Sequence, residues 1–119
     1  MKIAVTSTGT DLDAQVDPRF GRAAYILIVD TDTLAVEVLN NADNVNAFKG
    51  AGIQAASMIS DRHAGALLTG YCGPNAFKTL AAARIPVAGD VSGTVREAVA
   101  AYKDGKVTFQ TEPNAEGHW

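Results

Sequence analysis

The stretch LLTGYCGPNAFKTL, residues 67–80, indicates the end of a buried strand, a glycine-rich turn and the start of a helix. The apolar run 64–70 predicts the strand. Pro74 suits the first turn of a helix, because the N–H that proline lacks has no helical partner at that position. Phe77 and Leu80 then fall on one face of the helix. A strand that leads directly into a helix is typical of a parallel sheet, so this stretch predicts an α/β fold.

The rest of the chain follows the same kind of pattern. Thr94 and Glu97 match a capping box at a helix start, and Ile53, Ala56 and Ile59 recur on one helical stripe. The predicted strands are 1–8, 24–29, 34–39, 64–70 and 86–89, and the predicted helices begin near residues 47, 74 and 94. Because crossovers are right-handed, we expect a mixed five-stranded sheet flanked by three helices, with ribonuclease-H-like topology.

The chain length suits one domain. Its 119 residues leave little room for a second core. We expect a single α/β domain over residues 1–109, with 106–109 extended, followed by a flexible polar tail at 110–119.

Composition narrows the class of protein. The net charge is −3 and basic residues are scattered, which argues against a nucleic-acid binder. The single cysteine excludes an internal disulfide and a CxxC-type zinc or iron–sulfur site. The N-terminal apolar run 3–5 is too short for a signal peptide or a membrane span, so we expect a cytoplasmic protein without membrane contact. Neither GxxxxGK[ST] nor GxGxxG is present, and the first strand has no acidic residue, so the patterns of nucleotide binders and metal-dependent nucleases are missing.

The loops that leave the carboxyl ends of parallel strands gather at one edge of such a sheet, where ligands bind. We call this edge the rim, and it comprises segments 8–22, 40–49, 70–75 and 89–94. Two helix N-termini, near Pro74 and Thr94, point at the rim and attract anions. Arginines and lysines add positive charge there: Arg19, Arg22, Lys49 and Lys78. The sequence therefore predicts a non-catalytic site for an anion.

Several of these features also have a purely structural interpretation. Cys72 is either a small apolar filler or a thiol whose pKa is lowered by the neighbouring helix N-terminus. Phe20 either contacts a ligand or holds its loop against the core. Four carboxylates share the rim and either pair with the arginines or are solvated: Asp11, Asp13, Asp17 and Asp90.

Four stretches of the chain resemble the dinitrogenase iron–molybdenum cofactor biosynthesis family. They are DPRFGR at 17–22, YILIVDTDTLAVEVLNN at 25–41, LLTGYCGPNAFKTL at 67–80 and GTVREAVAAYKDGK at 93–106. The likeness covers residues 1–109. It implies a carrier from an anaerobe that holds an anionic molybdenum–copper sulfide cluster mainly by non-covalent contacts. The iron–molybdenum cofactor or its precursor is the alternative cargo, and an ATPase or a cofactor-assembly protein is the implied partner.

The rim and the resemblance together define the candidate cluster contacts. They are Thr8, Arg19, Phe20, Arg22, Gly70, Tyr71, Cys72, Gly73, Asn75, Ser92 and Gly93. Cys72 is also the candidate metal ligand at the rim. A metal-free regulatory or adaptor domain, which binds a partner protein through the same rim, is the competing function.

Overall fold

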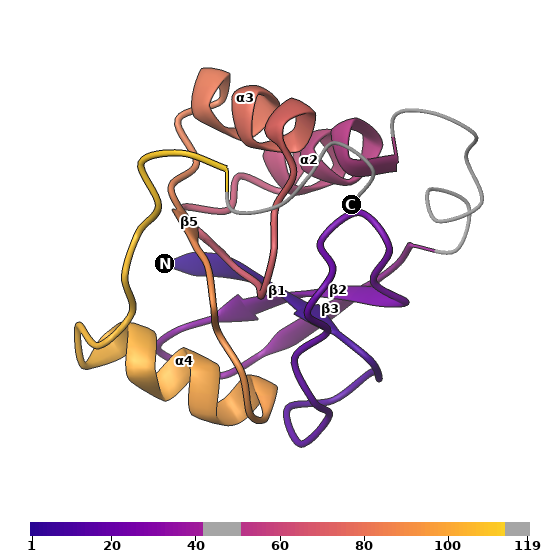
Figure 1. The fold of residues 1–119 in the computed structure, drawn as a ribbon. Coiled ribbons are helices and arrows are strands. Elements are labelled where there is room, and N and C mark those ends of the chain that lie inside the picture. Colours follow the sequence, from indigo (N-terminus) through magenta and orange to yellow (C-terminus); the bar gives the residue numbers. More distant parts are fainter. Residues whose placement is uncertain (42–50, 114–119) are drawn as a thin grey trace.

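A computed structural model describes residues 1–41 and 51–113 of the chain. Within these residues one mixed sheet has the strand order β3-β2-β1-β4-β5, and three helices cover it (Figure 1). The strands are β1 Lys2–Ser7, β2 Tyr25–Asp30, β3 Val36–Asn40, β4 Leu67–Leu68 and β5 Val87–Ala88, and the helices are α2 Ala51–Asp61, α3 Pro74–Ala82 and α4 Val95–Lys103. This arrangement confirms the predicted α/β class and ribonuclease-H-like topology.

β1 is the central strand of the sheet. It pairs antiparallel with β2, from Lys2 opposite Asp30 to Ser7 opposite Tyr25. It pairs in parallel with β4, which places Ala4 opposite Leu67. β4 and β5 are shorter than the predicted 64–70 and 86–89. After residue 69 the chain leaves the sheet and pairs with the rim loop instead, which ends β4.

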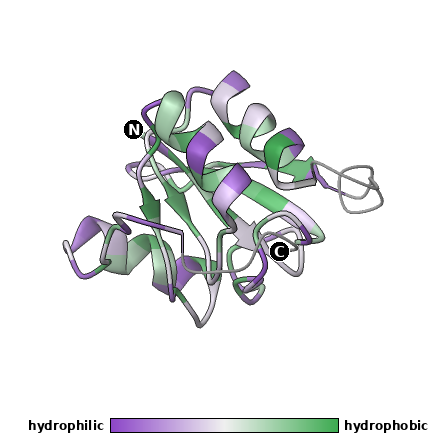
Figure 2. Cartoon of the chain, turned by 45° about the horizontal axis from the view of Figure 1, so that its top comes forward, coloured by the Kyte–Doolittle hydropathy of each residue, from purple (hydrophilic) through white to green (hydrophobic). Residues whose placement is uncertain are grey.

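The helices lie in two layers on opposite faces of the sheet. α2 and α3 cover one face and share a core with Ile26, Ile28 and Leu67, whereas α4 covers the other face above Val5 and Leu68 (Figure 1). In Figure 2 the hydrophobic residues lie on the strands and on the helix faces turned toward them. A hydrophobic core on each face of the sheet therefore supports the strands from which the rim loops leave.

The buried stripe of α2 differs from the predicted one. Ile53 is 40% exposed, while Ala55, Ala56 and Ile59 are buried. The true stripe begins at Gly52, where an added Cβ would lie 2.9 Å from the Cβ of Ala76 in α3. Ala56 and Ile59 are buried as predicted, and only Ile53 is wrong, because the glycine that takes its place carries no hydrophobic signal.

The segment after α4 returns along the outer edge of β5. Phe109 forms an antiparallel bridge with Ala88, and the Gln110 N–H donates to the Val87 carbonyl at 2.7 Å. Gln110, which the sequence placed in the tail, is therefore attached to the sheet. Residues 114–119 of the predicted tail, like 42–50 before α2, lie outside the described residues. None of the described helices is long and apolar enough to cross a membrane.

The burial of α2 gives a test on one helix. Ile59→Ala should lower the free energy of unfolding by about 2–5 kcal/mol, because it empties a fully buried position. Ile53→Ala, the same change on the exposed side, should cost less than about 1 kcal/mol. Urea denaturation measures both. Equal losses would contradict the observed orientation of the helix.

Candidate functional site

The first rim loop, residues 8–22, is fixed to the sheet and to the loop before α4. The Thr8 N–H donates to the Gln15 carbonyl at 3.0 Å, which closes the distal part of the loop on itself. The Val16 N–H donates to the Gly93 carbonyl at 2.8 Å, and the Asp17 N–H donates to the Thr6 carbonyl at 2.9 Å. The path of this long polar loop is therefore set by backbone hydrogen bonds.

The DPRFGR part of this loop lies directly beside the turn after β4. Arg19 and Tyr71 form a parallel bridge. The Tyr71 N–H donates to the Pro18 carbonyl at 2.6 Å, and the Phe20 N–H donates to the Tyr71 carbonyl at 3.1 Å. The two motifs that the sequence singled out thus meet at one end of the molecule, as the predicted rim requires.

The other two rim segments join the same edge as far as they are described. The Asp90 N–H donates to the Gly70 carbonyl at 2.8 Å, which brings in segment 89–94. Asn41 donates through Nδ2 to the Ala23 carbonyl at 2.8 Å, at the start of segment 40–49. Residues 42–50, including the candidate cation Lys49, lie outside the described residues.

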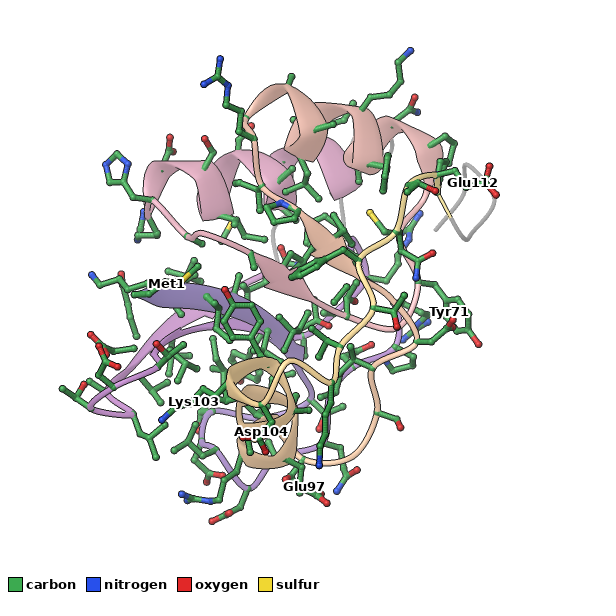
Figure 3. The ribbon with its side chains drawn as sticks, turned by 90° about the vertical axis from the view of Figure 1, so that its left-hand side faces the viewer. Met1, Tyr71, Glu97, Lys103, Asp104 and Glu112 are labelled. Carbon is green, nitrogen blue, oxygen red and sulfur yellow. The ribbon has the colours of Figure 1, made fainter. Side chains whose placement is uncertain are left out.

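The candidate contacts divide by exposure. Tyr71 is 41% exposed and lies at the end of the molecule opposite Met1 (Figure 3). The exposed candidates are Thr8, Arg19, Tyr71, Asn75 and Ser92, the half-buried ones are Arg22 and Gly93, and the buried ones are Phe20, Gly70, Cys72 and Gly73.

Gly70 is a structural position rather than a place for a ligand to approach. An added Cβ would lie 2.6 Å from the carbonyl oxygen of Pro18 and 2.7 Å from its Cα. The space that the sequence assigned to a ligand is filled by the backbone of the first rim loop. Gly93 is also a structural position, but for a different reason. Its φ of +87° is a backbone conformation that glycine adopts easily.

Phe20 does not form a wall of the site. Its side chain is 0% exposed and packs in the core beneath α2 and α3. The structural interpretation is therefore correct: Phe20 holds the DPRFGR loop against the core, and its neighbour Arg19 is exposed at the surface as a result.

Cys72 also points into the core. Its side chain is 1% exposed, and its Sγ lies 3.8 Å from the Gly73 carbonyl oxygen. Burial raises the pKa of the Cys72 thiol from about 9.0 to about 12. The expected lowering of this pKa by the helix N-terminus is wrong, because loss of hydration outweighs the helix dipole. A thiol buried in this way is not offered to a metal at the surface.

The two helix N-termini at the rim differ in what they offer to a ligand. The first-turn N–H groups of α4 already have partners: Val95 donates to the Ala14 carbonyl (2.9 Å), Arg96 to the Leu12 carbonyl (2.8 Å) and Glu97 to the Thr94 hydroxyl (3.1 Å). Within the described residues no side-chain hydrogen bond caps α3, whose N-cap is Gly73 and whose first residue is Pro74. Of the two helix N-termini that were expected to offer free N–H groups at the rim, that of α4 is ruled out and that of α3 remains the candidate.

The start of α2 lies against the start of α3. The close approach of Gly52 to Ala76 joins the first turns of these two helices. The positive ends of both helix dipoles consequently face the same part of the rim. The sequence analysis missed this pairing, and the signal that could have found it is a glycine three residues before the buried Ala55.

The rim carboxylates do not neutralise Arg19. Asp13 pairs instead with Arg96 at 3.1 Å. Oδ1 of Asp17 accepts a hydrogen bond from the backbone N–H of Arg19 at 3.0 Å. Within the described part of the chain, the Arg19 guanidinium makes no ion pair, so its charge faces solvent beside Tyr71.

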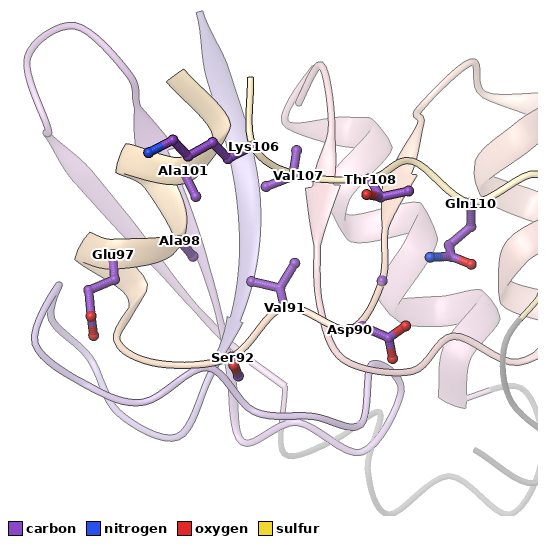
Figure 4. Close-up of a pocket in the computed structure, with 11 residues that line it drawn as sticks. Asp90, Val91, Ser92, Glu97, Ala98, Ala101, Lys106, Val107, Thr108 and Gln110 are labelled. Carbon is purple, nitrogen blue, oxygen red and sulfur yellow. The ribbon is translucent and has the colours of Figure 1, made fainter. Parts of the chain in front are cut away.

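A groove of about 400 Å³ borders the rim between α4 and segments 89–92 and 106–110 (Figure 4). Asp90 and Glu97 lie on either side of Val91, and Lys106 is the only basic residue among those that line the groove. Hydrogen bonds from the Thr94 backbone and hydroxyl hold the pKa of Glu97 below its usual range, so this carboxylate stays ionised. The groove is therefore unsuited to an anion.

The donor set at the rim fits a preformed anion better than a bare metal ion. Among the described residues, no group of three or more His, Cys, Asp and Glu side chains could hold a metal. The start of α3, the Arg19 guanidinium and the exposed Tyr71 ring offer N–H donors, charge and an apolar face instead. Charge-assisted hydrogen bonds of this kind bind anions.

The chain is similar to known proteins in both sequence and fold. A sequence model of a family described as dinitrogenase iron-molybdenum cofactor matches residues 1–105. The chain is similar to the apo form of the orange protein from Desulfovibrio gigas, with 48% identity and a TM-score of 0.93 over 96% of each chain. It is also similar to a putative NifB protein from Thermotoga, with 34% identity and a TM-score of 0.82 over 98% of each chain.

A more distant likeness supports the fold alone. A putative dinitrogenase from Methanocaldococcus jannaschii has 18% identity and a TM-score of 0.67, over 95% of this chain and 97% of its own. No curated protein matches the chain. The resemblance predicted from the motifs, including a likeness to the orange protein of sulfate-reducing bacteria, is confirmed.

The contact between Gly70 and Pro18 can be tested by adding one methyl group. Gly70→Ala should lower the free energy of unfolding by about 1–3 kcal/mol, because two backbone atoms of Pro18 occupy the space. Gly65→Ala is the matched control, since its methyl would meet chiefly the flexible end of the Met1 side chain, and it should cost less than about 1 kcal/mol. Urea denaturation decides, and a neutral Gly70→Ala would refute the contact.

The raised pKa of Cys72 predicts a pH dependence. Above about pH 9 the unfolded thiol loses its proton while the folded one keeps it. The stability that Cys72 adds is therefore complete below about pH 9, and it falls by up to about 1.4 kcal/mol per pH unit as the pH rises toward about 12. The difference in unfolding free energy between wild type and Cys72→Ala measures this, because other titrations cancel. A difference that stays constant with pH would contradict the buried thiol.

Proposed function

The chain belongs to the dinitrogenase iron–molybdenum cofactor family, and from this premise we propose that it binds and carries a preassembled, anionic molybdenum–copper sulfide cluster at the rim. The cluster is cargo, held mainly by non-covalent contacts and not chemically transformed. The observation that carries the proposal is the parallel bridge between Arg19 and Tyr71. It brings an exposed guanidinium next to the turn that leads into the uncapped start of α3.

Electrostatics favours an anion at this place. Each helix N-terminus carries the equivalent of about half a positive charge, and the starts of α2 and α3 are in contact. Arg19 adds a full charge that no carboxylate in the described residues neutralises. Arg22 follows on the same loop and is half-buried. Together these groups would offset the negative charge of a sulfide cluster.

The chemistry of the donor set favours a self-contained cluster over one that needs protein ligands. A molybdenum–copper sulfide cluster supplies its own sulfides, so it requires hydrogen-bond donors more than thiolates. The iron–molybdenum cofactor or its precursor is the alternative cargo, but iron would need a cysteine or histidine at the rim. Cys72 is buried, and the described residues contain no clustered metal ligands.

The proposed cargo also suggests the compartment and the partner proteins of the carrier. We place it in the cytoplasm of an anaerobe, where metal sulfides survive. An ATPase or a cofactor-assembly protein would deliver or receive the cluster. A metal-free adaptor that binds a partner through the same rim is the competing function, and binding experiments with cargo separate the two.

Removal of the rim arginines tests the proposal. In an anaerobic titration with tetrathiomolybdate and Cu(I), the wild type should develop visible charge-transfer absorption and retain molybdenum in a fixed ratio. Arg19→Ala should weaken binding by roughly 10- to 100-fold, since a hydrogen bond to a charged group contributes about 1.5–3 kcal/mol. Arg22→Ala should weaken binding in the same direction.

Two control variants sharpen this test. Arg62→Ala removes an exposed arginine at the far end of α2, where it pairs with Glu37 at 2.8 Å, and should leave binding unchanged. Cys72→Ala should retain binding if the cluster brings its own sulfides. Loss of binding in Cys72→Ala alone would mean that the thiol is a ligand. A wild type that stays colourless and free of molybdenum would favour the adaptor.

A further inference from the structure

Two fully buried hydroxyl groups lie directly beneath the rim. Thr6, near the end of β1, and Thr69, just after β4, are each 0% exposed, and their Oγ1 atoms are 2.9 Å apart. Thr6 Oγ1 also lies 2.7 Å from the carbonyl oxygen of Asp17, the first residue of DPRFGR. The pair therefore links two strands of the sheet to the loop that holds Arg19.

The direction of these hydrogen bonds follows from the number of hydrogens. A hydroxyl has one hydrogen to donate. A carbonyl can only accept, so the Thr6 hydrogen points to Asp17, and the Thr69 hydroxyl then donates to Thr6 Oγ1. The bonds form a directed chain from Thr69 through Thr6 to Asp17. The Asp17 N–H donates to the Thr6 carbonyl at 2.9 Å, so both the N–H and the carbonyl of Asp17 are bound to Thr6.

The chain of contacts continues to Arg19. Oδ1 of Asp17 accepts the Arg19 backbone N–H at 3.0 Å, and the Pro18 carbonyl between them accepts the Tyr71 N–H at 2.6 Å. The backbone of Arg19 is thus held by hydrogen bonds two residues after Asp17, the residue that the hydroxyl pair contacts. Valine has nearly the same volume as threonine but no hydroxyl, so Thr6→Val keeps the position filled and removes the hydrogen bond to the Asp17 carbonyl.

We propose that Thr6 and Thr69 are positioning residues for the cargo: their hydroxyl pair sets the place of the Arg19 guanidinium relative to the start of α3. This inference rests on the proposed function, and it assigns a binding role to residues that contact no ligand themselves. Neither residue stood among the sequence-derived candidates, because a threonine in an apolar strand gives no sign of which carbonyl it meets.

The test combines Thr6→Val with Arg19→Ala in a double-mutant cycle, read by the anaerobic titration with tetrathiomolybdate and Cu(I). Thr6→Val should weaken binding by about 3- to 10-fold, within the range of coupling between residues of one network. In the Arg19→Ala background, Thr6→Val should have no further effect. Thr6→Ser restores the hydroxyl and should return binding to within about twofold of wild type. Wild-type affinity in Thr6→Val, or an equal loss in both backgrounds, would overturn the inference.

Thr31→Val is the matched control. Thr31 is 6% exposed, and its hydroxyl donates to the Met1 carbonyl at 3.2 Å, at the end of the sheet away from Tyr71 (Figure 3). This variant loses one part-buried hydroxyl hydrogen bond far from the rim and should bind as the wild type does. A matching loss of affinity in Thr31→Val would show that general destabilisation is responsible.

A second measurement judges the positioning role without any cargo. In the cargo-free protein, Thr6→Val should speed amide hydrogen exchange of Phe20 and Tyr71, whose N–H groups hold the two loops together, while Thr31→Val leaves it unchanged. Unchanged protection in Thr6→Val would overturn the inference. If the wild type does not bind the probe, the proposed function fails on its own, and the exchange result still decides the role of the hydroxyl pair.

Discussion

The short backbone ladder between Pro18, Phe20 and Tyr71 is the constraint on which the rim depends. It joins segments that are some fifty residues apart in the sequence, and it closes only because Gly70 leaves room for the backbone of Pro18. Arg19 sits between its two hydrogen bonds and is exposed as a consequence. The position of the Arg19 backbone is thus decided by main-chain hydrogen bonds.

Local hydrogen bonding then decides what each helix end contributes. The topology brings the starts of α3 and α4 to the same edge of the sheet. The carbonyls of Leu12 and Ala14 and the hydroxyl of Thr94 satisfy the first turn of α4, so that end anchors the long rim loop. The N-cap of α3 is Gly73, so that residue offers no capping side chain, and none of the other described residues supplies one. The start of α4 is therefore structural, and on the proposed function the start of α3 is the one that faces the ligand.

The sequence predicted the elements well, because their signals are carried by side-chain periodicity and by turn residues. It failed where the decisive partner is backbone or where a side chain is missing. Gly52 opened the buried stripe of α2 without any hydrophobic signal, and Gly70 was assigned to a ligand although it faces Pro18. For Phe20 and Cys72 the sequence left a ligand contact and a core position both open, because it shows the loop they occupy but not the direction in which they point.

The burial of Cys72 bears on how a carrier can release its cargo. Copper in a sulfide cluster binds thiolates readily, so an exposed, ionised cysteine would compete with the sulfides of the cluster. Here the thiol before α3 is buried and protonated, with its pKa raised to about 12, while the exposed candidate contacts are Thr8, Arg19, Tyr71, Asn75 and Ser92, none of which is a thiol. On the proposed function, release then requires only the breaking of hydrogen bonds and ion pairs. The cluster can leave with its composition intact, which a carrier must achieve and an enzyme need not.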